Sequence, residues 1–317
     1  MDGENRRIGR RGVLRRGRVL LFPHAAGARA RADHDDMDGT LLNDEMVISP
    51  GNAAAIKHAQ SLGVHFVVSS GRSLEEIKPL IQAADITCPM ITLNGAIVLD
   101  ENAKMISAAP IPDTVAKKII VSLHKKGLYF EVITDKGVCS DDKAKRIENF
   151  AELLASISPD TSYKLAVTLA SARMELMNIN YVDNYMDLVD DPHTMICKIV
   201  VFSQEGMKVL GPIKDELSKD KNLVITSSGS RNIEINHVNA QKGVALAAFA
   251  DSLNVPMDNV MAIGDNNNDA SMIKAAGISY AVGNATDEIK MLAKHLTVNN
   301  TEDGVGKAIE EVLATKN

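Results

Sequence analysis

Short apolar runs and longer amphipathic stretches alternate along most of this chain. Runs rich in Val, Ile and Leu predict buried strands, and apolar residues recurring every three or four positions predict helices. The expected strands are 65–69, 90–93, 128–133, 196–202, 223–227, 232–236, 260–263 and 279–282. The expected helices are 52–62, 73–84, 115–125, 143–157, 207–217, 241–253, 269–276, 287–293 and 305–313.

This alternation occurs on both sides of a different middle section. Strands alternating with helices predict an α/β fold with a doubly wound parallel sheet, a Rossmann-like core. Pro110 and Pro112 mark a boundary. The stretch beyond them has strands and helices of its own and is too long for a loop. We therefore expect an inserted α+β domain at 113–231, within a core formed by 36–112 and 232–317.

The first 35 residues differ from the rest of the chain. Nine arginines fall between Arg6 and Arg31, and this arm contains no lysine. Basic arms can bind nucleic acid, and arginine-rich, acid-poor starts can be transit peptides. The arm is rich in Gly and shows little amphipathic period. We therefore interpret 1–35 as a disordered tail or as sequence foreign to the folded protein.

The segment before Asp36 also conflicts with a buried strand. Parallel central strands are usually continuous apolar runs, but residues 28–35 read Ala-Arg-Ala-Arg-Ala-Asp-His-Asp. Burying those charges would cost several kcal/mol for each unpaired one. The apolar run Val19–Phe22 ends fourteen positions before Asp36 and precedes Pro23, so we expect that it cannot supply the strand in register. The prediction is a short, distorted or unstable strand leading into Asp36; a shifted reading frame would explain both this segment and the arginine-rich arm.

Bulk properties exclude several classes of protein. The 317 residues suffice for two domains, and 45% hydrophobic content is ordinary for a globular chain. A net charge of −6 and only 3% aromatic residues give no sign of a nucleic-acid partner. Three scattered cysteines argue against a disulfide framework and suit a reducing cytoplasm. No apolar run approaches the length of a membrane span. Neither a substrate nor an oligomeric state follows from composition.

Two acidic motifs carry the candidate chemistry. The first is Asp36-Met37-Asp38-Gly39-Thr40, and the second is Gly264-Asp265-Asn266-Asn267-Asn268-Asp269, directly after the expected strand 260–263. Residues two apart in an extended segment face the same way, so Asp36 and Asp38 can point into one cleft. Such a pair, with a distant third carboxylate, suits Mg²⁺, which prefers oxygen ligands. Although Asp-Gly is also a common surface turn, this arrangement points to phosphoryl chemistry.

Two further residues fit the same chemistry. Ser70 lies between the strand 65–69 and a helix that opens with a capping box, Ser73 with Glu76. A hydroxyl at such a helix start can donate to a phosphoryl oxygen. Lys242 precedes an apolar helix; a lone lysine is normally a solvated surface residue.

Taken together, the residues resemble the haloacid dehalogenase-like hydrolase superfamily. Its four motifs are an Asp-x-Asp-Gly-Thr loop, a Ser or Thr at a strand end, a Lys, and a Gly-Asp-x-x-x-Asp loop, and all occur here in that order. The match narrows to Cof-type phosphatases with a large inserted cap. The segments similar to that group include Ser70-Gly71-Arg72, Leu93-Asn94-Gly95-Ala96, Ala281-Val282-Gly283-Asn284-Ala285 and Glu302-Asp303-Gly304-Val305. The resemblance runs from about Asp36 to the C-terminus.

The resemblance implies a role for each site residue. Asp36 is the nucleophile and a Mg²⁺ ligand, and Asp38 is the general acid and base, whose backbone carbonyl also binds the metal. Asp265 is the remaining protein ligand. The phosphoryl group is contacted by Ser70, Lys242 and Asn268, and the site is supported by Asp269, Gly39 and Thr40.

The resemblance also makes the inserted domain a cap over the active site. We expect the chain to pass between core and cap near Pro110–Asp113 and Ser230–Asn232, with Ser230 and Arg231 as cap contacts to substrate. The expected activity is Mg²⁺-dependent hydrolysis of small phosphorylated metabolites, such as sugar phosphates or phosphorylated cofactors, through an aspartyl-phosphate. A phosphomutase of the phosphomannomutase type, a non-catalytic phosphate-binding protein, and a nucleic-acid-binding protein using the basic arm remain alternatives.

Overall fold

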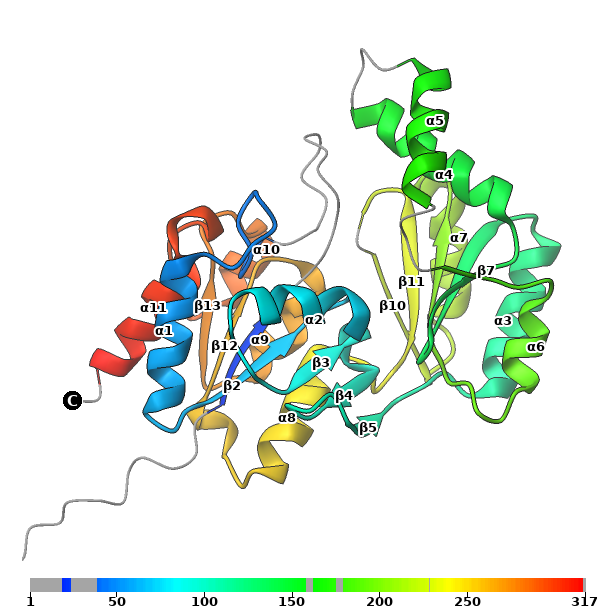
Figure 1. The fold of residues 1–317 in the computed structure, drawn as a ribbon. Coiled ribbons are helices and arrows are strands. Elements are labelled where there is room, and N and C mark those ends of the chain that lie inside the picture. The colour runs from blue at the N-terminus through cyan, green and yellow to red at the C-terminus, as the bar shows by residue number, and fades with distance from the viewer. Residues whose placement is uncertain (1–18, 24–38, 158–161, 175–178, 228, 316–317) are drawn as a thin grey trace, which may run out of the picture.

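The computed structural model describes residues 19–23, 39–157, 162–174, 179–227 and 229–315. These residues form two sheets, and Figure 1 shows each sheet with its own helices as one of two lobes. The expected α/β class is confirmed. The expectations that concern Asp36, Asp38 and residues 28–35 lie outside the described residues.

The larger sheet has eight strands in the order β14-β13-β12-β1-β2-β3-β4-β5. All pairs from β14 to β3 are parallel, whereas β3, β4 and β5 pair antiparallel. The expected parallel sheet is therefore present, with an antiparallel edge that was not expected. Its strands are β1 (Val19–Pro23), β2 (His65–Ser69), β3 (Met90–Thr92), β4 (Ile97–Leu99), β5 (Met105–Ala108), β12 (Val260–Gly264), β13 (Ile278–Ala281) and β14 (His295–Leu296).

The strand–helix–strand connections of this sheet run outward from its centre in two series. One series runs from β1 through α1 to β2 and through α2 to β3, and the other from β12 through α9 to β13 and through α10 to β14. Since parallel crossovers are right-handed, the two series place their helices on opposite faces. The direction changes between β1 and β12, where such folds bind ligands beyond the carboxyl ends of the strands. The helices of this lobe are α1 (Pro50–Ser61), α2 (Leu74–Ala83), α8 (Lys242–Ser252), α9 (Ala270–Ala275), α10 (Asp287–Leu292) and α11 (Gly304–Ala314).

The strand β1 corrects one expectation from the sequence. Val19–Phe22 does supply a central strand: Leu21 pairs with Val67 on β2 and with Ala262 on β12. The expectation was wrong because it required the strand to end at Asp36. The chain instead has fifteen residues, 24–38, between the end of β1 and Gly39. A continuous apolar run thus occupies the position where a buried parallel strand needs one.

The smaller sheet has six strands in the order β10-β11-β9-β6-β7-β8, and every pair is antiparallel except β7 with β8. Its strands are β6 (Tyr129–Thr134), β7 (Gly137–Ser140), β8 (Ile179–Tyr181), β9 (Ile196–Phe202), β10 (Leu223–Thr226) and β11 (Asn232–His237). Its helices are α3 (Asp113–Lys125), α4 (Lys143–Ile157), α5 (Tyr163–Met174), α6 (Tyr185–Asp190) and α7 (Met207–Leu217).

The strand β11 places the end of the smaller sheet beyond residue 231, where the sequence predicts the end of the inserted domain. Residues 232–237 were assigned to the core, but they pair with β9 and β10 in the smaller sheet. The chain therefore leaves this sheet after His237, not near Ser230–Asn232. The first crossing, between β5 and α3, spans residues 109–112. The boundary was misplaced because β11 and the helix α8 are separated by only four residues, 238–241, without a proline.

The two faces of the smaller sheet have different neighbours. Phe130, Ile199 and Ile235 pack in a cluster with residues of α3 and α7. Ile133 and Val200, on the alternate positions, belong to the core cluster of the larger sheet. Because strand side chains alternate between faces, the smaller sheet turns one face toward its own helices and the other toward the larger lobe.

The first residues of α1 and α2 are held by capping side chains close by in the sequence. The side chain of Ser49 accepts from the N–H of Asn52 at 3.1 Å, and Pro50 opens α1. The capping box expected at the start of α2 is confirmed, with Glu76 accepting from the N–H of Ser73 at 2.9 Å. Short 3₁₀ turns lie at Leu93–Gly95 (η1), Met257–Asn259 (η2), Asn267–Asp269 (η3) and Asn300–Glu302 (η4).

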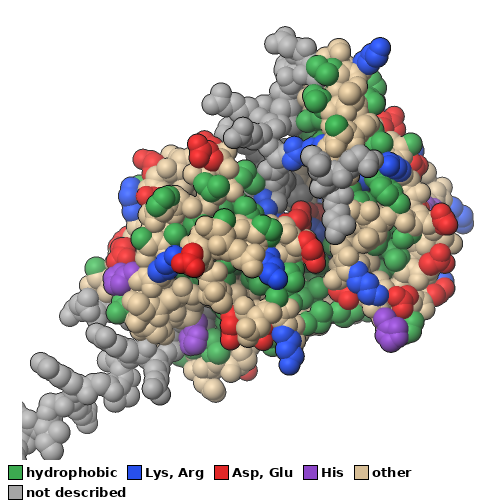
Figure 2. All heavy atoms as spheres, in the orientation of Figure 1, with side chains coloured by type: hydrophobic (Ala, Val, Ile, Leu, Met, Phe, Trp, Pro, Cys, Tyr) green, Lys and Arg blue, Asp and Glu red, His purple; other side chains and the backbone are tan. Residues whose placement is uncertain are grey.

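The surface carries charges of both signs (Figure 2), and the cysteines are unpaired. On the face drawn in Figure 2, Lys and Arg side chains are interspersed with Asp and Glu. All three cysteines are buried and free. Within the described ranges, no helix is both long and apolar enough to cross a bilayer.

Candidate active site

The predicted site residues of the larger lobe that the structure describes gather at the carboxyl ends of the central strands. Ser70 directly follows β2, and Asp265 directly follows β12. Gly39 and Thr40 come from a distant part of the sequence, yet Thr40 donates a hydrogen bond to Asp265. The structure thus brings the described parts of the motifs together at the point where the winding of the sheet reverses, as expected for a ligand site.

Asp265 is held by its surroundings. Thr40 Oγ1 donates to its Oδ1 at 2.5 Å. Burial of the carboxylate, and then the negative charge of Asp269, raise the pKa of Asp265 to about 6, against the opposing effects of the Thr40 hydrogen bond and the Lys242 charge. A Cβ at Gly39 would lie 2.5 Å from Asp265 Oδ2, so a larger residue there would displace this carboxylate. A cation beside Asp265 would therefore offset a charge that the protein leaves poorly compensated.

Lys242 and Asp269 form a buried ion pair at the loop of the second acidic motif, residues 264–269. Lys242 Nζ donates to Asp269 Oδ1 at 2.6 Å, and the two side chains are 2% and 1% exposed. Asp269 Oδ2 accepts from the N–H groups of Asp265 at 3.0 Å and Asn266 at 3.2 Å. One carboxylate thus orients the lysine and shapes the loop that carries Asp265.

Ser70 is fully buried at the end of β2. Its Oγ accepts from the N–H of Arg72 at 3.1 Å, and its carbonyl accepts from the N–H of Asn94 at 2.9 Å. Its own N–H donates to the carbonyl of Ile91 at 2.8 Å. These bonds fix the serine hydroxyl relative to the sheet.

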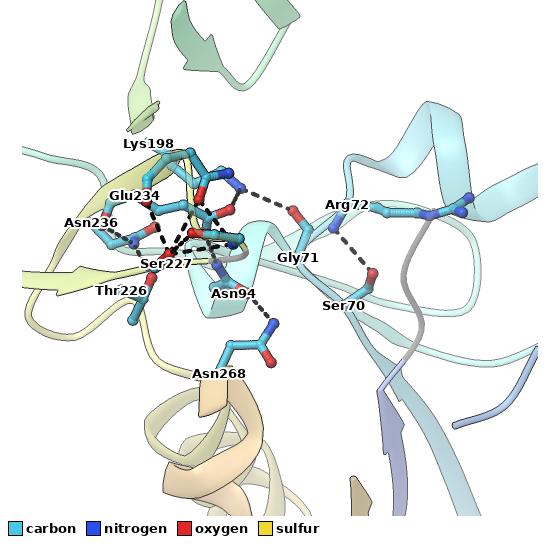
Figure 3. Close-up of polar contacts among 12 residues, drawn as sticks. Ser70, Gly71, Arg72, Asn94, Lys198, Thr226, Ser227, Glu234, Asn236 and Asn268 are labelled. Carbon is cyan, nitrogen blue, oxygen red and sulfur yellow. Dashed lines mark hydrogen bonds and ion pairs between the residues drawn. The ribbon is translucent and has the colours of Figure 1, made fainter. Parts of the chain in front are cut away.

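Asn94 is a site residue to which the sequence assigned no role. It lies in η1 with a φ of 60°, a left-handed conformation that asparagine tolerates better than most residues. Its Oδ1 accepts from Asn268 Nδ2 at 3.4 Å (Figure 3). The signal available in the sequence was the Asn-Gly pair at 94–95, which favours such a turn.

Asn284 and Asn300 hold the segment that follows the first acidic motif. Asn284 Nδ2 donates to the carbonyl of Gly39 at 2.7 Å, and Asn300 Nδ2 donates to the carbonyl of Leu42 at 2.8 Å. The N–H of Asn300 in turn donates to Asn284 Oδ1 at 3.0 Å. Both residues lie in or near segments that resembled the Cof-type group, but polar residues in loops do not reveal from sequence which carbonyl they reach.

A cavity of about 340 Å³ lies between the two lobes at this site. Core residues Asn94, Lys242 and Asn268 and smaller-sheet residues Thr226 and Asn236 are among those that line it. Within the described structure, the buried Oδ1 of Asn236 has no hydrogen-bond partner. Because Asn236 is one of the residues that line this polar cavity, its unpaired acceptor is suited to a ligand that carries a donor.

Ser230 and Arg231, the expected substrate contacts, lie in the turn between β10 and β11. Arg231 donates to Gln204 Oε1 at 3.4 Å, within the smaller lobe. Their role in binding stays a prediction. The residues of β10 and β11 that line the cavity are Val224, Thr226 and Asn236.

The metal ligands expected from the sequence lie partly outside the described ranges. Among the described residues, no three His, Cys, Asp or Glu side chains cluster as a metal site. Asp265 is the one expected ligand that the structure describes, since Asp36 and Asp38 lie outside the described ranges. Its carboxylate, with a raised pKa and one hydroxyl donor, has the chemistry of a partial oxygen site for a divalent cation.

This geometry can be compared with that of known proteins. The sequence pattern of the haloacid dehalogenase-like hydrolases matches residues 35–309. The chain belongs to that family. Within the family it groups with the Cof-type proteins, as the motifs predicted.

Individual relatives agree along nearly their whole length. The chain is 34% identical over 280 residues to the 5-amino-6-(5-phospho-D-ribitylamino)uracil phosphatase YwtE of Bacillus subtilis, covering 88% of this chain and 96% of that one. It is 27% identical to the pyridoxal phosphate phosphatase YbhA of Escherichia coli, covering 86% and 95%. A solved haloacid dehalogenase-like hydrolase from B. subtilis superposes with a TM-score of 0.76 at 25% identity, covering 93% and 99%.

Proposed function

We propose that this haloacid dehalogenase-like hydrolase is a Mg²⁺-dependent phosphatase that cleaves phosphate monoesters of small metabolites, with the smaller lobe as its cap. The supporting observation is the set formed by Thr40, Asp265, Asp269 and Lys242 at the carboxyl ends of the central strands. A buried lysine oriented by a carboxylate, next to a second carboxylate, suits the binding and neutralisation of a phosphoryl group.

In the proposed reaction, a carboxylate oxygen of Asp36 forms a bond to phosphorus while the bond from phosphorus to the ester oxygen breaks. Asp38 gives its proton to that leaving oxygen. Water then attacks the phosphorus of the aspartyl-phosphate, Asp38 takes a proton from this water, and the Asp36 carboxylate is released. Ser70, Asn268 and Lys242 contact the non-bridging oxygens.

Asp265 would hold Mg²⁺ together with Asp36 and the backbone carbonyl of Asp38. A bound ion would neutralise phosphate charge that otherwise repels the carboxylates. Lys242 adds a second positive charge, and Asp269 keeps that ammonium in place. The general acid is what separates this proposal from a non-catalytic phosphate-binding protein, since binding alone does not need a second carboxyl.

The substrate is proposed from the relatives and the cavity. YwtE is named for a ribitylamino-uracil phosphate and YbhA for pyridoxal phosphate. The cavity residues Asn94, Thr226 and Asn236 are uncharged hydrogen-bonding groups. These two phosphorylated metabolites, and sugar phosphates with free hydroxyls, are the first candidates.

A phosphate-release screen over these compounds, with Mg²⁺ and with excess EDTA, tests the proposal. We expect release with Mg²⁺, none with EDTA, and inhibition by Ca²⁺, which takes more ligands at longer distances and would bind a carboxylate through both oxygens. Full activity in EDTA would exclude the metal assignment. Isomerised product without free phosphate would indicate the phosphomutase alternative.

A further inference from the structure

Two buried charges of the smaller lobe have no part in the proposed chemistry. Lys198 lies on β9 and Glu234 on β11, and each residue is 7% exposed. Their neighbours Ile199 and Ile235 point into the lobe's own cluster. Lys198 and Glu234 are therefore on the opposite face of the sheet, which is the face turned toward the core.

The two side chains form an ion pair across the sheet. Glu234 lies opposite Val200 and Lys198 opposite Asn236, so the pair is diagonal between adjacent strands. Lys198 Nζ is 3.5 Å from Glu234 Oε1. Two charges in this setting need partners, because a buried ion pair with unfilled hydrogen bonds is unfavourable.

Both charges find further partners in the core (Figure 3). Glu234 Oε2 accepts from Asn94 Nδ2 at 2.8 Å. Lys198 Nζ lies 3.4 Å from the carbonyl of Gly71, to which it donates. The pair thus joins the two lobes at η1 and at the loop after β2.

These core partners are bonded to the proposed phosphate contacts. Gly71 is adjacent to Ser70, and the N–H of Asn94 donates to the Ser70 carbonyl at 2.9 Å. The side chain of Asn94 accepts from Asn268 at 3.4 Å. Each proposed phosphate contact, Ser70 and Asn268, is therefore one residue away from the ion pair of the smaller lobe.

We propose that Lys198 and Glu234 are positioning residues: when the cap lies against the core, they align Ser70 and Asn268 for the phosphoryl group through Gly71 and Asn94. This inference rests on the proposed function only in identifying Ser70 and Asn268 as phosphate contacts. It makes tight phosphate binding conditional on cap docking, because the donors reach their positions only with Glu234 and Lys198 in place. Small misplacements of such groups strongly reduce rates.

Orthophosphate, the expected product, is the probe, titrated calorimetrically in Mg²⁺ buffer against the full chain. The informative variant is the double substitution Lys198→Met with Glu234→Leu. It removes both charges, and replacing a buried ion pair with apolar groups is often neutral or stabilising, so we expect a folded protein. We expect its orthophosphate affinity to fall at least tenfold while its melting temperature stays at or above that of the wild type.

The single variants separate positioning from folding. Glu234→Gln should lower both stability and phosphate affinity. A purely structural role predicts that the double variant restores both properties, and this result would overturn the proposal. Our proposal predicts that it restores stability alone.

A matched control is the neighbouring pair Glu131 and Arg146. Glu131 also lies opposite Val200, on the other side of β9, and its described partners, Arg146 and Tyr129, are in the smaller lobe. Glu131→Gln with Arg146→Met should leave orthophosphate affinity unchanged. An equal loss in this control would show a general effect of removing cap charges and would refute the specific role.

A variant on the core side gives independent evidence. Asn94→Gly removes the amide that Glu234 binds and keeps the left-handed backbone accessible. It should also weaken orthophosphate binding tenfold or more, and unchanged binding would contradict the proposal even if the double variant failed to fold. Phosphate binding is measured without turnover, so a wild type that binds orthophosphate but hydrolyses no ester would remove the proposed function and leave this inference standing.

Discussion

At the scale of single residues, the ion pair of Lys242 and Asp269 combines stability and chemistry. Both side chains are at most 2% exposed, so Asp269→Asn leaves a buried ammonium without its anion. Breaking such a pair costs about 3–5 kcal/mol. The double variant Lys242→Met, Asp269→Asn should recover part of that loss, measured by denaturant unfolding, while turnover is largely lost because the lysine charge proposed to meet the phosphoryl group is missing.

The exposed ion pair of Lys57 and Asp85 is the control for the Lys242 and Asp269 variants. Lys57 Nζ lies 2.8 Å from Asp85 Oδ2, but the aspartate side chain is 96% exposed. Asp85 has a positive φ of 53°, which asparagine tolerates. Asp85→Asn should therefore leave the unfolding midpoint unchanged. If the changes in the free energy of unfolding caused by Lys242→Met and Asp269→Asn simply added up in the double variant, the two side chains would not be energetically coupled, contrary to this prediction.

The two carboxylates of the first motif should respond differently to substitution. Asp36→Asn should remove nearly all turnover, because an amide cannot form the acyl-phosphate. Asp38→Asn should be slow with alkyl phosphates yet still form phosphoenzyme from an ester with an activated leaving group, which needs less protonation. Phosphoenzyme after rapid quenching is the measurement. More than about a tenth of wild-type rate in Asp36→Asn, a barrier change under about 1.4 kcal/mol, would make the covalent route wrong.

At the scale of elements, the connection after β1 gives a sharp test. Deleting residues 23–35 joins Phe22 to Asp36, which then takes the place of Pro23 opposite Ser69. The sheet needs no other change, since β1 already pairs on both sides. Each doubling of a loop costs about 0.6 kcal/mol, so this shortening should stabilise the protein by on the order of 1 kcal/mol, or a few degrees in melting temperature.

Phosphate release should rise in the same deletion variant, because Asp36 then ends a paired strand, level with Ser69 and Gly264 and one position before the level of Ser70 and Asp265. Removing residues 2–17, which precede β1, is the control and should change neither property. If the deletion lowers both melting temperature and rate, the intervening residues are a required part of this protein.

Elements with strong local patterns were predictable, and those that depend on distant contacts were not. The strand Ile196–Phe202 and the helices Lys143–Ile157 and Met207–Leu217 have the bounds expected from their apolar periods. Strands β4, β5, β7 and β8, of three or four residues each, and helices α5 and α6 were missed. Such short strands form because a partner strand is adjacent in space, which no local pattern records.

In the candidate site, too, some residues were predictable from local motifs and others were not. Ser70, Asp265 and Lys242 could be predicted because they follow strands or open a helix within recognisable motifs. Glu234 and Lys198 could not, since a charged residue inside a strand usually faces water. Their burial results from the packing of one sheet face against another lobe, which depends on the tertiary structure.

At the scale of the whole molecule, we propose that the larger sheet supplies the chemistry and the smaller sheet the substrate selectivity. The groups proposed to act on phosphorus come from the larger lobe, while Thr226 and Asn236 bring smaller-lobe groups to the same cavity. Asn236 Nδ2 donates to the carbonyl of Glu234 at 3.3 Å, which fixes the orientation of its amide and leaves Oδ1 as the unpaired acceptor. Asn236→Leu should therefore lower kcat/KM for substrates whose leaving group donates a hydrogen bond.

The size of that change follows from the polar group that is lost. A site that binds a hydroxyl discriminates by about 1–3 kcal/mol for each unsatisfied partner, or roughly five- to 150-fold. We expect this loss for a ribityl or sugar phosphate relative to wild type, and little change for p-nitrophenyl phosphate, whose leaving group has no donor. Asn268→Ala, in the larger lobe, should instead slow all three substrates by similar factors, because it contacts the phosphoryl group they share. Equal losses for every substrate in Asn236→Leu would show that the smaller sheet supports the site without selecting what enters it.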